Sequence, residues 1–341
     1  MSPISDINKE SLKNNFDVVG IGNAIVDVIS HESEQFLKEF GLIKESMALI
    51  DEETAIDLYN HMSPTIQTSG GSAANTMSGI TSLGGSSSYI GKVRNDHLGD
   101  VFSHDIHAAG VHYSVKPSEQ GQPTARSMII VTPDGARTMN TFLGISTTLY
   151  KEDLDVSLIE NSKVLYCEGY IWDVEATKDT IRSAIAIAKN AGRKISFTLS
   201  DSFCVLRHHQ DWVDLVNGPI DILFGNEEEI QALSGCGSFT EAVEWIKGRV
   251  EIACLTRAAA GSVIVTEEKI IEIAAKPVEQ IVDSTGAGDL YAAGFLFGYT
   301  RELDLETCGR IGSIAASEII VHTGARPFSS LKEIVSSELH S

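Results

Sequence analysis

The chain has 341 residues, of which 43% are hydrophobic and 21% are charged, and its formal net charge is −21. This length suits two domains, or one large α/β domain with an insertion. The acidic balance argues against nucleic acid and against anionic membranes as partners. A site for an anionic substrate would therefore need positive charge from helix dipoles, a metal ion or a few basic side chains.

The first residues and the cysteines bear on where the protein works. The N-terminal stretch MSPISDINKESLKNNF is polar and lacks the apolar segment of a secretory signal, so we expect residues 1–16 to form a disordered leader. No apolar run reaches the roughly 18 residues that a membrane span needs. The five cysteines are scattered without a CxxC pair, which favours a reduced, cytoplasmic setting over a zinc or disulfide framework.

Short apolar runs alternate with amphipathic segments along most of the chain. The predicted strands are Val18–Gly22, Ser88–Gly91, Lys163–Glu168, Lys194–Leu199, Asp221–Phe224 and Ile252–Thr256. The predicted helices include Ala73–Leu83, Leu98–Ala109 and Ala176–Ala191, and each is followed by a glycine that suits a helix C-terminus. This alternation predicts an α/β fold with a mainly parallel central sheet covered on both faces.

Two stretches, residues 28–69 and 112–143, break this alternation. The first contains an isolated strand-like run, Ser46–Asp51, and the second contains ARSMIIVTPDGARTMNTF, with the turn Pro133-Asp134-Gly135 between two strands. Antiparallel elements inserted in this way predict a small β-sheet that acts as a lid. The main domain would then consist of residues 17–27, 70–111 and 144–341.

The segment VDSTGAGDLYAAGFLFGY carries the strongest chemical signal. A polar run, Asp283–Thr285, leads into Gly286-Ala287-Gly288, and Asp289 then opens a long apolar stretch. The first N–H groups of a helix lack intrahelical partners and lie at the positive end of its dipole, so this segment predicts an anion cradle. An acid beside such a cradle suits the transfer of a charged group onto a hydroxyl. The alternative to a functional site is a purely structural one, in which the glycines form a tight turn and Asp289 favours the start of a helix.

The stretch DSTGAGD resembles the C-terminal signature of the ribokinase-like (pfkB) carbohydrate and nucleoside kinases. Three further segments follow the family's order: GIGNAIVDV (Gly20–Val28), SGGSAANT (Ser69–Thr76) and DILFGNEEE (Asp221–Glu229). The resemblance spans about residues 17 to 327. It implies a three-layer ribokinase-like fold with ATP and Mg²⁺ as cofactors and a small-molecule sugar or nucleoside as acceptor. A dinucleotide fingerprint at GIGNAI is rejected, because the third glycine is missing.

The resemblance also assigns catalytic roles. Asp289 would accept the proton of the acceptor hydroxyl, and backbone N–H groups of Ala287, Gly288 and Asp289 would hold the transferring phosphoryl group in the cradle that Gly286 opens. Arg137, on the second strand of the hairpin, would bring mobile positive charge to the phosphate. Arg126 competes for that role, and a solvated hairpin arginine is the plain alternative.

Acceptor contacts are expected from two segments. Asn23 and Asp27 would bind sugar hydroxyls, while Gly70, Gly71 and Asn75 would let the backbone approach the substrate and contact it. Without the resemblance, these residues would be explained by a strand end, a turn and a helix start packed with small residues.

Nucleotide and metal contacts are expected from three segments. Asn226 and Glu229, three residues apart at a helix start, would orient water around Mg²⁺, although an acidic helix N-terminus is explanation enough for them. In LTRAAAGSVIV, Thr256 and Gly261 would form a nucleotide turn, where Ala258 replaces the family's usual glycine. Gly286 and Gly288 would also contact ATP. Asp283 and Thr285 would bind a monovalent cation such as K⁺.

The most specific expectation concerns the identity of the acceptor molecule. The segments GNAIVD, ILFGNEEE and QPTA (Gln122–Ala125) look closest to adenosine kinases, which implies phosphorylation of the 5′-hydroxyl of adenosine to AMP in purine salvage. Ile171, flanked by Tyr170 and Trp172, would lie against the purine, unless these residues are plain core. The alternatives are a sugar kinase for ribose, fructose or 2-keto-3-deoxygluconate and, in another class, a non-catalytic binding protein. A monomer and a homodimer both remain open.

Overall fold

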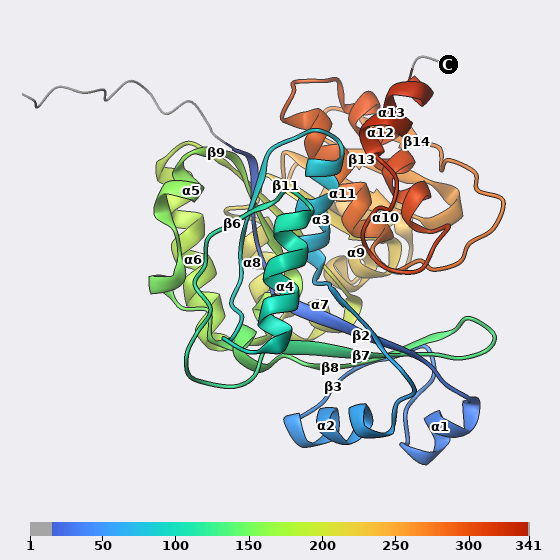
Figure 1. Ribbon diagram of the computed structural model, residues 1–341. Coiled ribbons are helices and arrows are strands. Elements are labelled where there is room, and N and C mark those ends of the chain that lie inside the picture. The colour runs from blue at the N-terminus through green and yellow to red at the C-terminus, as the bar shows by residue number, and fades with distance from the viewer. Residues whose placement is uncertain (1–15, 340–341) are drawn as a thin grey trace, which may run out of the picture.

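A computed structural model describes residues 16–339, so the predicted leader lies outside the described residues except for Phe16. The larger part of the molecule is built on a nine-stranded sheet (Figure 1). Its strand order is β14 (Ile270–Ile273), β13 (Ser262–Val265), β12 (Ile252–Thr256), β11 (Ile222–Asn226), β10 (Lys194–Thr198), β9 (Ser162–Glu168), β1 (Phe16–Ile21), β5 (Ser87–Ile90) and β6 (His112–Tyr113). The strands from β12 to β6 are parallel, and β13 runs antiparallel to both of its neighbours, β12 and β14. The predicted mainly parallel sheet is therefore confirmed.

Helices cover both faces of this sheet, because its central strands are apolar on both sides. Successive residues alternate between two cores: Val18 and Val164 point into one, and Val19 and Leu165 into the other. The first core is closed by α3 (Ser72–Ser82), α4 (His97–Ala108), α11 (Ala287–Tyr299), α12 (Leu305–Ile319) and α13 (Leu331–Leu339). The second is closed by α5 (Val156–Glu160), α6 (Glu175–Asn190), α7 (Ser202–Arg207), α8 (His209–Val216), α9 (Glu227–Ser234) and α10 (Phe239–Ile246). These are the three expected layers.

A second, five-stranded sheet lies below the main sheet in Figure 1. Its order is β3 (Met47–Leu49), β8 (Arg137–Phe142), β7 (Ala125–Val131), β2 (Ile25–His31) and β4 (Ile66–Ser69). The β7–β8 pair is the hairpin that the sequence predicts, and Gly135 takes the φ of 84° that its turn requires. Helices α1 (Glu34–Glu39) and α2 (Glu52–His61) cover the face turned away from the main sheet.

Two boundaries of the small sheet differ from the expected ones. The chain leaves the main sheet after Ile21 and enters the small sheet at Ile25, so Asp27 lies on a lid strand and not at the end of a main-sheet strand. Residues His112 and Tyr113 pair with β5 and therefore belong to the main sheet. The first difference arises because only three residues separate β1 from β2, so the two strands read as one apolar run in the sequence.

Helix ends and apolar content agree with the sequence pattern. Gly84, Gly110 and Gly192 follow α3, α4 and α6 with φ values of 87°, 80° and 70°, the left-handed conformation that ends a helix. Within residues 16–339, none of the helices is both long and apolar enough to cross a membrane.

Candidate active site

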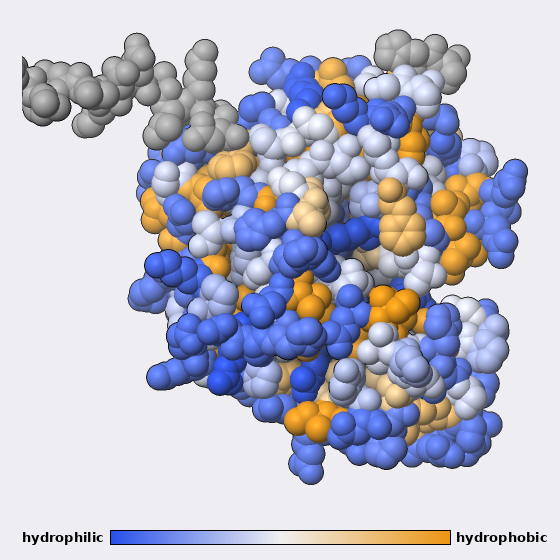
Figure 2. Space-filling model, in the orientation of Figure 1, coloured by the Kyte–Doolittle hydropathy of each residue, from blue (hydrophilic) through white to orange (hydrophobic). Residues whose placement is uncertain are grey.

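A cavity of about 690 Å³ lies between the carboxyl ends of the main parallel strands and the inner face of the small sheet. Figure 2 shows the molecule hollowed where these two parts meet. Most of the residues expected to act line this cavity: Asn23, Asp27, Gly71, Asn75, Asn226, Glu229, Thr256, Thr285, Gly286, Ala287, Gly288 and Asp289. Five expected residues are not on its wall: Gly70, Arg137, Ile171, Gly261 and Asp283.

The anion cradle is the N-terminus of α11. Gly286 caps this helix with a φ of 81°, a conformation that favours glycine. The N–H of Ala287 was expected to hold a ligand, but it donates to the Ser284 carbonyl at 3.2 Å. Gly288 and Asp289 follow in the first turn, where N–H groups have no intrahelical acceptor. A side chain added at Gly288 would meet no atom within 4 Å, so the cavity is open above these donors.

Asp289 is held by two donors from α3. Ser72 donates its hydroxyl to Oδ1 at 2.6 Å, and Asn75 donates Nδ2 to Oδ2 at 3.0 Å. Burial raises the pKa of Asp289 above the usual aspartate value, and these two hydrogen bonds oppose the rise. Asn75, expected to contact the acceptor, therefore orients the candidate base, and Ser72, which was not predicted as a site residue, has the same role.

Asp27 faces the cavity from the small sheet. Gly70 permits this position, because an added Cβ would lie 2.5 Å from Oδ2 of Asp27. Burial raises the pKa of Asp27 to about 6, while the positive charges of Arg137 and Arg326 oppose the rise.

Arg326 was not predicted as part of the site. Its Nε, Nη1 and Nη2 atoms are buried and have no hydrogen-bond partner among the described residues. Burial lowers the pKa of Arg326 to about 10, and the carboxylates of Asp105 and Asp27 oppose this effect. An unpaired buried guanidinium thus adds positive charge behind Asp27.

Glu168 is a further carboxylate on the wall that the sequence analysis left unassigned. Its two oxygens accept from the backbone N–H groups of Asn23 and Ala73, both at 2.8 Å. Burial raises its pKa to about 7, although these hydrogen bonds oppose the rise. Glu168 therefore ties the end of β1 to the start of α3, and its place at the end of a strand was the available signal.

Arg137 reaches from the small sheet to the main domain. Its Nη1 forms an ion pair with Oδ2 of Asp283 and donates to Oγ1 of Thr285 at 3.0 Å, while its Nη2 is buried without a partner. Asp283 also accepts from the N–H groups of Thr285 and Gly324, each at 3.0 Å. A guanidinium thus takes the place expected for a monovalent cation at Asp283 and Thr285.

Asn226 and Glu229 form a capping box at the start of α9. Glu229 N–H donates to Oδ1 of Asn226 at 2.9 Å, and the N–H and Nδ2 of Asn226 donate to the carboxylate of Glu229 at 2.9 and 2.7 Å. Burial raises the pKa of Glu229 to about 7. Among the described residues no group of three or more His, Cys, Asp or Glu side chains could hold a metal ion. The water-mediated Mg²⁺ role of Glu229 stays a prediction.

The expected nucleotide turn joins β12 to β13. Thr256 and Ala258 line the cavity, but Gly261 does not. Gly261 has a φ of 86°, and an added Cβ would lie 2.0 Å from the Ile273 carbonyl, so it shapes the hairpin instead of contacting a ligand. Ala258 keeps a φ of 47°, which explains why glycine suits this position.

The 3₁₀ helix η3 (Gly169–Asp173) corrects the expectation for Ile171. Ile171 and Trp172 are each 1% exposed and pack in the second core, whereas Tyr170 and Asp173 line the cavity. Three residues per turn place positions 170 and 173 on one face and turn the two between them away. The wall residue of this segment is therefore Tyr170.

Comparison with known proteins shows which family this chain belongs to. The family model described as pfkB family carbohydrate kinase matches residues 47–332. The crystal structure of adenosine kinase from Sinorhizobium meliloti shares 46% identity with a TM-score of 0.90, covering 96% of this chain and 99% of that one. A structure described as a probable sugar kinase protein from Rhizobium etli CFN 42 shares 45% identity with a TM-score of 0.91, covering 95% and 99%.

More distant relatives carry both kinds of name. Adenosine kinase 2 of Arabidopsis thaliana is 27% identical, covering 91% of this chain and 96% of its own length. A fructokinase from Klebsiella pneumoniae is 26% identical, covering 68% and 77%. The order of the motifs, the two sheets and the family match agree, and this chain is a member of the pfkB family of carbohydrate kinases.

Proposed function

We propose that this protein is an ATP-dependent adenosine kinase that phosphorylates the 5′-hydroxyl of adenosine to AMP. The observation that carries the proposal is the set of residues that line one cavity. Its wall includes the N-terminus of α11 with Asp289, Asp27 of the small sheet, and Tyr170. The similarity to an adenosine kinase at 46% identity supports the same acceptor.

The nucleotide end fits the phosphates of ATP. The first turn of α11 offers N–H groups toward open space above Gly288, and Asn226, Thr256 and Ala258 continue the wall. ATP supplies the phosphoryl group, and Mg²⁺ neutralises its charge. With so few protein ligands available, Mg²⁺ would be held by water near Asn226 and Glu229.

Asp289 is the proposed general base. A carboxylate whose pKa is raised by burial is a better proton acceptor, and its two α3 donors fix its direction toward the acceptor hydroxyl. Arg137, with one nitrogen unpaired, brings positive charge beside the cradle when the small sheet is in this position. Positioning and neutralisation of charge contribute most in phosphoryl transfer, so a weak base is enough.

Asp27 is the proposed anchor of the ribose. An ionised carboxylate accepts hydrogen bonds from two vicinal hydroxyls, and this pair is present in adenosine. The inner face of the small sheet adds apolar cover from Ile25, Ile129 and Met139. The small sheet then acts as the lid, which excludes water and limits hydrolysis of ATP.

A sugar kinase for ribose, fructose or 2-keto-3-deoxygluconate is the second candidate, because relatives with sugar kinase names also match over most of the chain. ADP release is the test, measured with MgATP and one acceptor at a time, including adenosine, inosine and these three sugars. The proposal predicts that adenosine gives a kcat/KM well above the rest. A free sugar as the best acceptor would overturn it and leave the kinase chemistry intact.

Three broader expectations stay predictions: a cytoplasmic location, a role in purine salvage, and a monomeric or homodimeric state.

A further inference from the structure

Tyr170 and Asp173 present an aromatic ring and a carboxylate to the cavity from the same face of η3. We propose that this pair recognises the base of the acceptor, with the ring packing on the purine and Asp173 accepting a hydrogen bond from its 6-amino group. The inference rests on the proposed function, because it needs a nucleoside in the acceptor site. It assigns the specificity of the site to a residue that no sequence motif marks.

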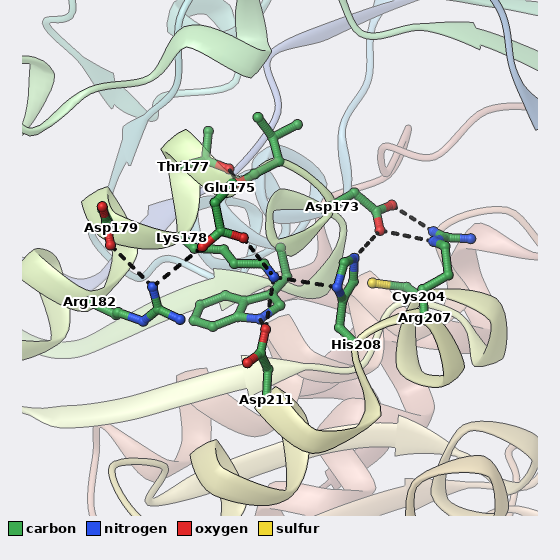
Figure 3. A network of polar contacts seen from close by, with 12 residues as sticks. Asp173, Glu175, Thr177, Lys178, Asp179, Arg182, Cys204, Arg207, His208 and Asp211 are labelled. Atoms are coloured by element: carbon green, nitrogen blue, oxygen red, sulfur yellow. Dashed lines mark hydrogen bonds and ion pairs between the residues drawn. The ribbon is translucent and has the colours of Figure 1, made fainter.

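Asp173 is fixed from behind by donors of α7 and of the residue that follows it. Arg207 donates through Nε to Oδ1 at 3.1 Å and through Nη2 to Oδ2 at 2.6 Å, and His208 donates Nε2–H to Oδ1 at 2.9 Å (Figure 3). The side chain of Asp173 is only 11% exposed. Two residues thus hold a nearly buried carboxylate in one orientation.

The tautomer of His208 follows from the contact of its other ring nitrogen. The Lys178 ammonium lies 3.4 Å from Nδ1 and has only hydrogens to offer, so Nδ1 is the acceptor and Nε2 carries the hydrogen toward Asp173. Lys178 is buried and is held by Asp211 at 2.8 Å and Glu175 at 3.2 Å (Figure 3). Layered support of this kind fixes a side chain more firmly than a surface ion pair would.

The supported carboxylate keeps capacity for a ligand. A carboxylate has about four acceptor positions, and Arg207 and His208 use three of them. It accepts N–H groups and repels carbonyl oxygens, so it favours a 6-amino group over a 6-oxo group. Met47 and Leu49 of the small sheet and Leu143 also line the cavity, and apolar side chains of this kind suit the second face of a purine.

The competing explanation is that Asp173 only ties η3 to α7. The two explanations differ in one observable. A purely structural Asp173 has no reason to distinguish ligands that differ in a single amino group.

The test compares kcat/KM for adenosine with kcat/KM for purine riboside, which lacks only the 6-amino group. Loss of a hydrogen bond to a charged acceptor predicts a preference for adenosine of about 10- to 100-fold in the natural protein. In Asp173→Ala the preference is expected to fall to about threefold or less. Asp179→Ala is the matched control, because Asp179 belongs to the same network through Arg182 but lies outside the cavity, so it should keep the full preference.

Arg207→Gln is the second variant, in case Asp173→Ala folds poorly. It keeps the carboxylate and loosens it, so the preference should fall partway, by about threefold. Equal kcat/KM for the two nucleosides in the natural protein would overturn the inference, and so would a preference that survives Asp173→Ala. If both nucleosides were phosphorylated equally well, adenosine kinase activity would stand while this inference failed. If adenosine gave no product, the proposed function would fail and the inference with it.

Discussion

At one end of the cavity the single segment Asp283–Asp289 supplies the backbone of the anion cradle, whereas the other end is assembled from side chains that lie far apart in the sequence. The cradle depends on the start of α11 and on the φ of Gly286. The proposed acceptor end combines Asp27 of β2 with Tyr170 and Asp173 of η3, which all line the cavity, and the charge of Arg326 acts on Asp27. A helix N-terminus serves any phosphate donor, while scattered side chains can change one at a time.

This difference matches the mixture of names among relatives, in which kinase activity is shared and the acceptor varies. It predicts that changes at the cradle affect every acceptor equally. Changes at the acceptor end should alter selectivity and leave ATP binding unaffected.

Replacement of the proposed base should have the largest effect. Asp289→Asn keeps the shape of the side chain but removes the proton acceptor, so kcat is expected to fall by about 10²- to 10⁴-fold for every acceptor. Steady-state ADP release measures this loss, and calorimetry should show ATP binding within about threefold of normal. A variant with kcat close to normal would contradict the assignment of Asp289. Glu228→Gln, a change of the same kind at an exposed residue in the first turn of α9, is the control.

Acceptor binding should depend on pH through Asp27. Burial raises its pKa to about 6, the charges of Arg137 and Arg326 oppose this rise, and the carboxylates of Asp283 and Asp289 add to it. The ionised form accepts the ribose hydroxyls, so affinity should be full at pH 8 and fall as the pH drops through 6. Calorimetry without ATP should give about tenfold weaker adenosine binding at pH 5 than at pH 8.

Asp27→Asn should remove this dependence and bind weakly at both pH values, with ATP affinity unchanged. If the variant retained the pH dependence, another group would be responsible. The same titration in Asp289→Asn shows whether the second carboxylate contributes.

The two cradle glycines should respond differently to a methyl group. In Gly286→Ala the new Cβ would lie 2.9 Å from Cβ of Ala325. Holding alanine at a φ of 81° costs about 1–2 kcal/mol more, so Tm should fall by several degrees. In Gly288→Ala the methyl enters open space, so Tm should be unchanged while KM for ATP rises by about tenfold. Equal losses of Tm in both variants would show that the cradle is not built as described.

The smallest effect is expected at Ala258. Glycine removes the strain of the left-handed φ of 47° in the folded chain, but it also raises the entropy of the unfolded chain. The net effect of Ala258→Gly should be to stabilise the folded protein by about 0.5 kcal/mol. Ala259→Gly, next to it in the same 3₁₀ turn, should destabilise by about 0.5–1 kcal/mol. Thermal unfolding measures both, and a loss of stability in Ala258→Gly would contradict the strain argument.

The sequence predicted well whatever depends on local pattern. The parallel strands, the β7–β8 hairpin and the cradle can be read from contiguous residues, because apolar period, turn chemistry and helix start signals are local. The resemblance to the family rested on the same contiguous motifs.

The sequence could not show which side chains share a wall. Ile171 was expected at the acceptor because nothing in EGYIWDVE reveals that it folds as a 3₁₀ turn with Ile171 inside. The pairing of Arg137 with Asp283 and the hold of Ser72 on Asp289 depend on tertiary contacts between distant segments. Such contacts carry no periodic signal, so the detail of the acceptor end appears only in the folded chain.

The most direct test is a competition for one donor. The protein is given limiting γ-labelled MgATP with equal concentrations of adenosine, ribose and fructose, and the labelled products are separated and identified by mass. The account predicts that nearly all label appears in AMP, at the 5′ position. Label mainly in a sugar phosphate would contradict the assignment of the acceptor end to a nucleoside.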